Sequence, residues 1–260
     1  MSRVGLFIVG VQKGGTTALD SLLRLHPQIG MAVGKKEPHH FDDEQVDWLS
    51  PDHAAYHRRF EFADHAKRVF GDATPIYIYW PGALERIRAY NPDARLVVCL
   101  RHPAHRAYSH WLMETVRDKE TLPFAEAIRA GRSRVAASEG GVHRIFSYIE
   151  RGEYGGQIER LLSLFSRESV RFIRTDDLWS NQESVLKQLH AFLELAPGPA
   201  PPTPTYVSIP PSGGGLPIPR EEQAYITGLL APEVLKAASL TGLDLGDWLD
   251  PGYREPMTAG

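Results

Sequence analysis

The chain has 260 residues, a formal net charge of −3 and 42% hydrophobic residues. This length and apolar content suffice for one sizeable core, so we expect a single domain over 1–260. The slightly negative charge argues against a general nucleic-acid binder, which is usually basic. No apolar run is long enough for a transmembrane helix, and no signal-peptide pattern is present. The single cysteine, Cys99, excludes internal disulfides and favours a cytoplasmic location.

Apolar runs and helical patterns alternate along the chain. The unbroken apolar run over 4–10 predicts a buried strand, and apolar residues at helical spacing follow it over 17–25. Further strands are expected over 29–33, 68–72, 94–101 and 170–175, and helices over 53–66, 81–90, 103–117, 182–195 and 220–240. The alternation is typical of a doubly wound α/β fold, with a mainly parallel central sheet flanked by helices.

The stretch FIVGVQKGGTTALDSLL, residues 7–23, runs from a strand through glycines into a helix. The first backbone N–H groups of a helix lack partners, and the helix dipole adds about half a positive charge there, so such a turn binds anions. The glycines let the backbone approach the anion closely, the threonines offer hydroxyl donors, and the lysine adds a full charge. The expected anion ligands are Lys13, Gly14, Gly15, Thr16 and Thr17.

This loop is not a Walker loop, which requires G-x-x-x-x-G-K-[ST]. Gly10 and Gly15 have the required separation, but Thr16 stands where the lysine should be. We therefore expect a phosphate-like ligand held without the usual ATP arrangement. The plainer alternative is a glycine-rich strand-to-helix turn that binds nothing.

A second candidate element is CLRHPAHRAYSHW, residues 99–111. Arg101 ends the clearest strand, and Ser109 lies eight residues later, on the second turn of the next helix. An arginine at this place can hold a phosphate bidentately, and the serine hydroxyl can reach the same group. Alone this spacing is a weak signal, since the alternative is a solvated arginine and a serine on the helix surface.

Together these elements resemble a known family. GVQKGGTTAL is similar to the 5′-phosphosulfate loop of sulfotransferases that use 3′-phosphoadenosine 5′-phosphosulfate (PAPS), and RHPAHRAYSH is similar to their 3′-phosphate motif. KKEPHHFD (35–42) and GDATPIYIYWP (71–81) resemble segments of the heparan-sulfate-type branch. RGEYGGQIERLLSLF (151–165) and GLDLGDW near the C-terminus resemble its later patterns. The resemblance covers nearly the whole chain.

The resemblance implies sulfuryl transfer from PAPS to an acceptor, with 3′-phosphoadenosine 5′-phosphate (PAP) as product and no metal. It makes Lys13 the cation that stabilises the leaving phosphate, and it places Glu37 in the position of the general base. His39 is a partner of Glu37 or an alternative base. The implied cofactor-binding residues are Gly14, Gly15, Thr16, Thr17, Arg101, Ser109, Tyr154 and Arg220. Tyr154 is equally expected as a core aromatic.

The acceptor is expected to be a small-molecule natural product of secondary metabolism or a carbohydrate. Nucleic-acid and membrane partners are not expected, and a homodimer is compatible with the family, in which many relatives dimerise. Several aromatic residues are expected to border the acceptor or to belong to the core: Phe41, Trp48, Tyr77, Tyr79 and Trp80.

Two departures from the family pattern affect this interpretation. Ala73 precedes Thr74-Pro75, where the heparan-sulfate enzymes often have lysine, and this argues against a highly anionic polysaccharide acceptor. The proline- and glycine-rich stretch over 197–219 lacks the basic residues that the family places in its C-terminal loop. We therefore expect a cofactor lid over 211–220, built from backbone N–H groups and Arg220. Long loops of this kind are usually lids, binding loops or linkers.

Two other functions compete with this one. A P-loop phosphotransferase would use ATP and magnesium, with Asp72 at the end of the strand over 68–72 as a metal ligand. The misplaced lysine argues against it. A non-catalytic binding module would retain the fold without turnover.

Overall fold

The computed structural model describes residues 3–200 and 217–256. Most of the proline- and glycine-rich stretch, including residues 211–216 of the lid expected over 211–220, lies outside these residues. The described chain divides into two compact units: the first takes 3–100 and 160–200, and the second takes 101–159 and 217–256. The single domain over 1–260 stays a prediction.

The first unit is built on a five-stranded sheet with the order β2-β3-β1-β4-β5, in which every pair is parallel. The strands are β1 Leu6–Gly10, β2 Ile29–Met31, β3 Val69–Asp72, β4 Arg95–Leu100 and β5 Val170–Arg174. The chain leaves the central strand β1 toward β2 and β3, then returns to the other side of β1 for β4 and β5. Such a reversal creates a crevice beyond the carboxyl ends of the strands, where doubly wound proteins bind ligands. The predicted fold class is confirmed.

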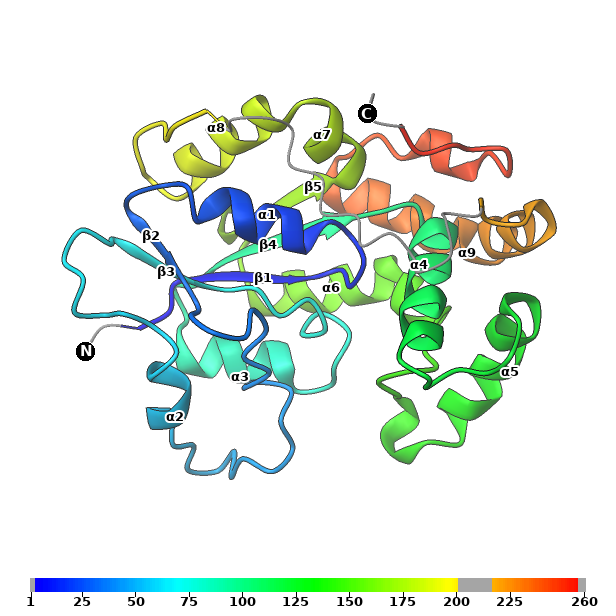
Figure 1. The fold of residues 1–260 in the computed structure, drawn as a ribbon, viewed down its shortest axis with the longest axis horizontal. Coiled ribbons are helices and arrows are strands. Elements are labelled where there is room, and N and C mark those ends of the chain that lie inside the picture. Colours follow the sequence, from blue (N-terminus) through cyan, green and yellow to red (C-terminus); the bar gives the residue numbers. More distant parts are fainter. Residues whose placement is uncertain (1–2, 201–216, 257–260) are drawn as a thin grey trace. The chain divides into compact units, whose positions relative to one another are not determined.

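Helices cover both faces of this sheet (Figure 1). On one face lie α1 Thr16–Leu23, α7 Thr175–Ser180 and α8 Gln182–Phe192, whose apolar side chains share one core cluster with β1, β4 and β5. On the other face lies α3 Ala83–Tyr90, and the short α2 Ala54–His57 precedes β3. Because both faces are covered, strands such as β4 are continuous apolar runs without polar alternation.

The second unit is helical. Its helices are α4 Pro103–Val116, α5 Phe124–Ala136, most of α6 Tyr154–Leu164, and α9 Arg220–Thr241. Short 3₁₀ helices are Glu139–Gly141, Glu150–Gly152 and Gly246–Leu249 here, and Arg167–Ser169 in the first unit. Residues of α4, α5 and α9 form its apolar core. Pro103 occupies the first turn of α4, where its missing N–H costs nothing.

The expected helix over 53–66 is wrong beyond its first turn, because only Ala54–His57 is helical. The ring of Phe60 packs 5.1 Å from that of Tyr56, and Phe62 packs 4.6 Å from Phe70 of β3. This aromatic packing turns the chain, so tertiary contacts override local helix propensity. The helices α5, α6 and α7 were not predicted from the sequence.

No helix in the described part of the chain is long and apolar enough to cross a membrane. The cytoplasmic location stays a prediction.

Candidate active site

The loop after β1 places the predicted anion ligands at the carboxyl end of the central strand. Lys13 and Gly15 both have left-handed backbones, with φ of 69° and 83°, and Gly15 is the N-cap of α1. Thr16 is buried and Thr17 is exposed at the first turn of that helix. The loop therefore turns sharply into a helix start whose first amides lack intrahelical partners, as the sequence pattern predicts.

Gly14 fits this loop because the backbone packs tightly against β4. A Cβ atom at this position would lie 2.5 Å from the carbonyl oxygen of Cys99 and 2.9 Å from that of Val11. The Gly14 amide donates to the Val11 carbonyl oxygen at 2.9 Å, so it is engaged within the loop. The amides of Gly15, Thr16 and Thr17 therefore remain the candidate anion donors of the predicted set.

Thr175, the first residue of α7, ties this loop to the end of β4 by hydrogen bonds. Its hydroxyl oxygen lies 2.8 Å from the carbonyl oxygen of Gly14 and 2.9 Å from that of Leu100, and one hydroxyl hydrogen serves both acceptors. The side chain is fully buried. Sequence reasoning missed this residue, since 161 positions separate Thr175 from Gly14.

Replacing Thr175 by valine is expected to destabilise the protein by about 1–3 kcal/mol, because two buried carbonyl groups lose their shared donor. Urea unfolding of Thr175→Val and of Thr175→Ser measures this effect. The serine variant keeps the hydroxyl and should recover most of the stability. Equal stability of the valine variant and the wild type would show that the hydroxyl does not support the loop.

A chain of polar contacts links the start of α1 to the two candidate bases. The Lys36 ammonium donates to the Thr17 hydroxyl at 3.0 Å and lies 3.3 Å from a carboxylate oxygen of Glu37. The other Glu37 oxygen lies 3.2 Å from Nε2 of His39, and Nδ1 of His39 lies 2.9 Å from the buried Asp42 carboxylate. Residues 37–40 form neither a helix nor a strand, and His39 has a φ of 53°. Glu37 and His39 are therefore brought together by an irregular segment.

These contacts set the charges of the cluster. Burial opposes protonation of His39, but hydrogen bonds to Asp42 and Glu37 outweigh it and raise the pKa of His39 to about 9. Burial also opposes ionisation of Glu37, yet the hydrogen bond from His39 and the charge of Lys36 hold the pKa of Glu37 below its ordinary value. At neutral pH the cluster therefore contains a carboxylate at Glu37 and an imidazolium at His39.

His39 is expected to titrate near pH 9, against an ordinary value of 6.5. A raised pKa means that its contribution to stability is complete below pH 6.5 and is lost as the pH rises through about 9. The variant Asp42→Asn removes one of the charges that raise this pKa, so its His39 should titrate at lower pH. An NMR titration of the imidazole measures both values. Titration of the wild-type His39 near 6.5 would contradict the assignment.

Asp72, the magnesium ligand of the rival interpretation, is fully buried at the end of β3. One of its oxygens accepts from Thr74 at 2.6 Å, and the other accepts from Tyr56 and Tyr77 at 3.0 Å each. Burial raises the pKa of Asp72 to about 6, although these hydrogen bonds oppose the shift. With both oxygens surrounded by hydroxyl donors, Asp72 organises the aromatic core and is poorly placed to bind a metal ion.

The predicted aromatic residues divide between core and surface. Phe41 and Tyr77 are fully buried, with ring centroids 5.7 Å apart, and they belong to the core. Trp48, Tyr79 and Trp80 are half-buried. Trp48 carries the Arg86 guanidinium 4.5 Å from its ring, and Arg86 pairs with Glu44. The half-buried aromatics keep their predicted role as a border of the acceptor.

In the second unit, Arg101 is held by a carboxylate. Its Nε and a terminal nitrogen donate to the two oxygens of Glu255 at 2.5 and 2.6 Å, and His105 lies 3.4 Å from the same carboxylate. This pair lowers the pKa of Glu255 to about 2 despite its burial. Tyr154 is buried and donates from its hydroxyl to the Arg101 carbonyl oxygen at 2.7 Å, so it positions the Arg101 backbone.

The other predicted residues of this unit lie on helices. Ser109 is half-buried on α4, and Arg220 is exposed as the first residue of α9. Their roles toward a cofactor stay predictions.

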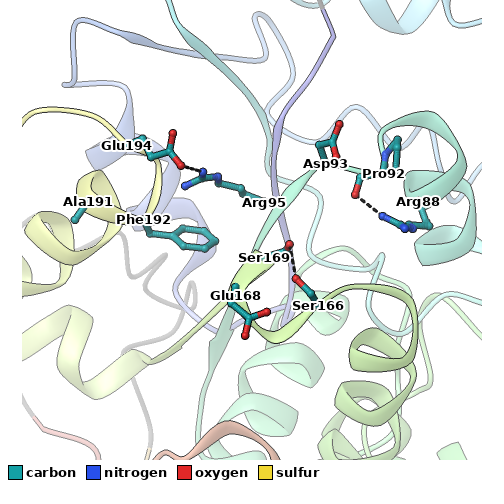
Figure 2. Close-up of a pocket in the computed structure, with 10 residues that line it drawn as sticks. All are labelled: Arg88, Pro92, Asp93, Arg95, Ser166, Glu168, Ser169, Ala191, Phe192 and Glu194. Carbon is teal, nitrogen blue, oxygen red and sulfur yellow. Dashed lines mark hydrogen bonds and ion pairs between the residues drawn. The ribbon is translucent and has the colours of Figure 1, made fainter.

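The first unit also has a pocket that is separate from the loop after β1 (Figure 2). It lies at the amino ends of β4 and β5, beside Arg95 and Ser169, whereas the anion loop follows the carboxyl end of β1. The ion pair of Arg95 with Glu194 lies across it. Because ligands of doubly wound folds bind at the carboxyl ends, this pocket is not the predicted site.

Among residues 3–200 and 217–256, no group of three or more His, Cys, Asp or Glu side chains is arranged to hold a metal ion.

A doubly wound parallel sheet with an anion-ready loop at the carboxyl end of its central strand is typical of α/β proteins that bind phosphate-containing ligands there. Residues 5–203 match the sulfotransferase domain family. Mouse heparan sulfate glucosamine 3-O-sulfotransferase 3B1 is 32% identical over 188 residues, which are 72% of this chain and 45% of that protein. The chain therefore belongs to the sulfotransferase family.

Two further comparisons agree with this assignment. The bifunctional heparan sulfate N-deacetylase/N-sulfotransferase 1 of Caenorhabditis briggsae is 28% identical over 221 residues, which are 80% of this chain and 24% of that protein. The crystal structure of a sulfotransferase from Alicyclobacillus acidocaldarius has a TM-score of 0.79 and 28% identity, and the match covers 95% of this chain and 99% of that one. The chain spans less than half the length of these two heparan sulfate enzymes.

Proposed function

We propose that this chain transfers the sulfuryl group of PAPS to a hydroxyl group of a small-molecule natural product or a carbohydrate. One observation carries the proposal: in the first unit, Lys36 connects the start of α1 to Glu37 by contacts of 3.0 and 3.3 Å. An anion-binding turn and a candidate base are thereby held together, as sulfuryl transfer to a hydroxyl requires.

The backbone geometry of the loop supports its proposed role toward the phosphosulfate of PAPS. Gly14 leaves no room for a Cβ atom, and Gly15 adopts a left-handed backbone that starts α1. The resemblance assigns the 5′-phosphosulfate to Lys13, Gly14, Gly15, Thr16 and Thr17, and the 3′-phosphate to Arg101 and Ser109. Because the Gly14 amide donates to Val11, we propose the other four loop residues as its ligands. As the bond from sulfur to the bridging oxygen breaks, Lys13 and the amides would stabilise charge on the leaving phosphate. Such a preorganised donor contributes about 3–4 kcal/mol.

Glu37 is the base in this proposal, and His39 is its positioning partner. Both ring nitrogens of His39 face carboxylates, those of Glu37 and Asp42. A protonated imidazole in this position has no lone pair with which to accept the proton of an acceptor. The Glu37 carboxylate keeps lone pairs beyond those used by Lys36 and His39. The acceptor hydroxyl would therefore give its proton to Glu37.

The class of acceptor follows from the relatives and from the charge of the site. The mouse 3-O-sulfotransferase named above acts, by its name, on a hydroxyl of a glucosamine in heparan sulfate. Here the position before Thr74-Pro75 is Ala73, which is fully buried in the core cluster. Position 73 thus supplies no cation for a polyanion. We therefore favour a neutral or weakly charged hydroxyl compound over a highly sulfated chain.

Thermal stabilisation by PAP, compared with ADP and ATP with and without magnesium, tests the cofactor, because a ligand of the native state raises Tm by mass action. We expect a large rise with PAP that does not depend on magnesium. A rise only with ATP and magnesium would overturn the proposal in favour of phosphoryl transfer. Incubation with labelled PAPS and a panel of phenols, glycosides and oligosaccharides, with mass-spectrometric detection of sulfated products, then identifies the acceptor.

A further inference from the structure

Lys36 is a cation that the predicted site did not include. Its ammonium donates to the hydroxyl of Thr17 at 3.0 Å and lies 3.3 Å from Glu37. Its side chain is 20% exposed, whereas the neighbouring Lys35 is exposed. Two adjacent lysines of equal charge are thus placed differently, and only Lys36 is directed to the start of α1.

Both partners of Lys36 belong to the proposed reaction. Thr17 is one of the groups assigned to the phosphosulfate, and Glu37 is the assigned base. The Lys36 ammonium contacts both of these groups. The first turn of α1 contains no acidic side chain, and the carboxylate paired with Lys36 is that of Glu37.

The charge balance of the reaction gives such a cation a task. In the proposed step, the acceptor oxygen forms a bond to sulfur and the bond from sulfur to the bridging oxygen breaks. The electron pair of that bond stays on the 5′-phosphate of PAP, and the acceptor proton goes to Glu37. Negative charge builds up on the bridging oxygen as this bond breaks, next to the anionic sulfonate oxygens. An ammonium at this place therefore stabilises the transition state more than the bound substrate.

We propose that Lys36 is a second catalytic cation. Its ammonium, held beside the Thr17 hydroxyl, contacts the transferring sulfonate of PAPS, and it also orients Glu37 toward the acceptor. This role rests on the proposed function. It also compensates for the buried, uncharged Ala73, the position where the sequence resemblance expects lysine. Lys13 and Lys36 then flank the transferring group from two segments of the first unit.

The variant Lys36→Met tests this role, with Lys36→Arg as the conservative variant and Lys35→Met as the matched control. PAP lacks the sulfonate, so its Kd should change less than about twofold in Lys36→Met, while the Kd of PAPS should rise about tenfold or more, as for a lost charge-assisted hydrogen bond. With the acceptor found by screening, kcat should fall about 100- to 1,000-fold. Lys36→Arg should recover part of kcat, and Lys35→Met should match the wild type.

The pH profile separates contact with the sulfonate from a merely structural role. Because Lys36 lowers the pKa of Glu37, its loss should move the acid limb of kcat/KM to higher pH. Equal losses of PAP affinity, PAPS affinity and Tm in Lys36→Met, with no recovery in Lys36→Arg, would overturn the catalytic role. So would a kcat within about threefold of the wild type, since loss of a catalytic donor costs far more.

Failure of the underlying function has a different signature. A wild-type chain that neither binds PAP nor transfers a sulfuryl group overturns the proposed function itself. A wild-type chain that does both, while Lys36→Met retains both, overturns only the role of Lys36.

Discussion

Replacing Glu37 by glutamine is expected to lower kcat about 100- to 10,000-fold, the usual contribution of a positioned general base. Glutamine keeps the size of the side chain, and its one carbonyl oxygen can accept from either Lys36 or His39, so the fold and PAP binding should persist. The loss should appear in kcat and kcat/KM together, because proton transfer belongs to the transition state. Steady-state kinetics with the screened acceptor, together with PAP thermal shifts, measure both effects.

Two variants make this experiment decisive. Glu61→Gln makes the same chemical change at an exposed glutamate and should retain full activity. His39→Gln removes the partner that holds Glu37, so it should lower kcat less than Glu37→Gln does. The reverse order of effects, with a silent Glu37→Gln and an inactive His39→Gln, would make His39 the base and Glu37 its partner.

Replacing Arg101 by alanine is expected to remove most of the affinity for PAP while ADP binding changes little. A bidentate arginine–phosphate pair is a strong, charge-assisted interaction, and ADP lacks the 3′-phosphate. Lysine cannot reproduce the planar fork, so Arg101→Lys should recover only part of the affinity. Isothermal titration with PAP and ADP measures the difference. Parallel losses for both nucleotides would exclude a specific 3′-phosphate contact.

Replacing Glu255, the partner of Arg101, is expected to have the opposite effect on PAP affinity. Its carboxylate occupies two donors of Arg101 at 2.5 and 2.6 Å, and a phosphate at these donors would meet its negative charge. The variant Glu255→Gln removes that charge and should bind PAP more tightly than the wild type. Weaker PAP binding in Glu255→Gln would mean that the carboxylate orients Arg101 for the phosphate and does not compete with it.

Much of the first unit could be predicted from the sequence because its signals are local. Continuous apolar runs marked β1 and β4, which are buried on both faces. The glycines at 14 and 15 marked a strand-to-helix turn, since few other residues fit its backbone. The helix expected over 53–66 failed because aromatic packing around Tyr56 turns the chain after His57.

The sequence by itself determined the five strands and their order along the chain, the anion-ready loop after β1 and, through the spacing of its motifs, the resemblance to the sulfotransferase family. Tertiary structure alone decided which side chains complete these elements. Thr175 under Gly14, Lys36 on Thr17 and Glu255 on Arg101 join residues that are 161, 19 and 154 positions apart. Local sequence patterns cannot predict such pairs, because these contacts form only when the sheet and the helices pack together.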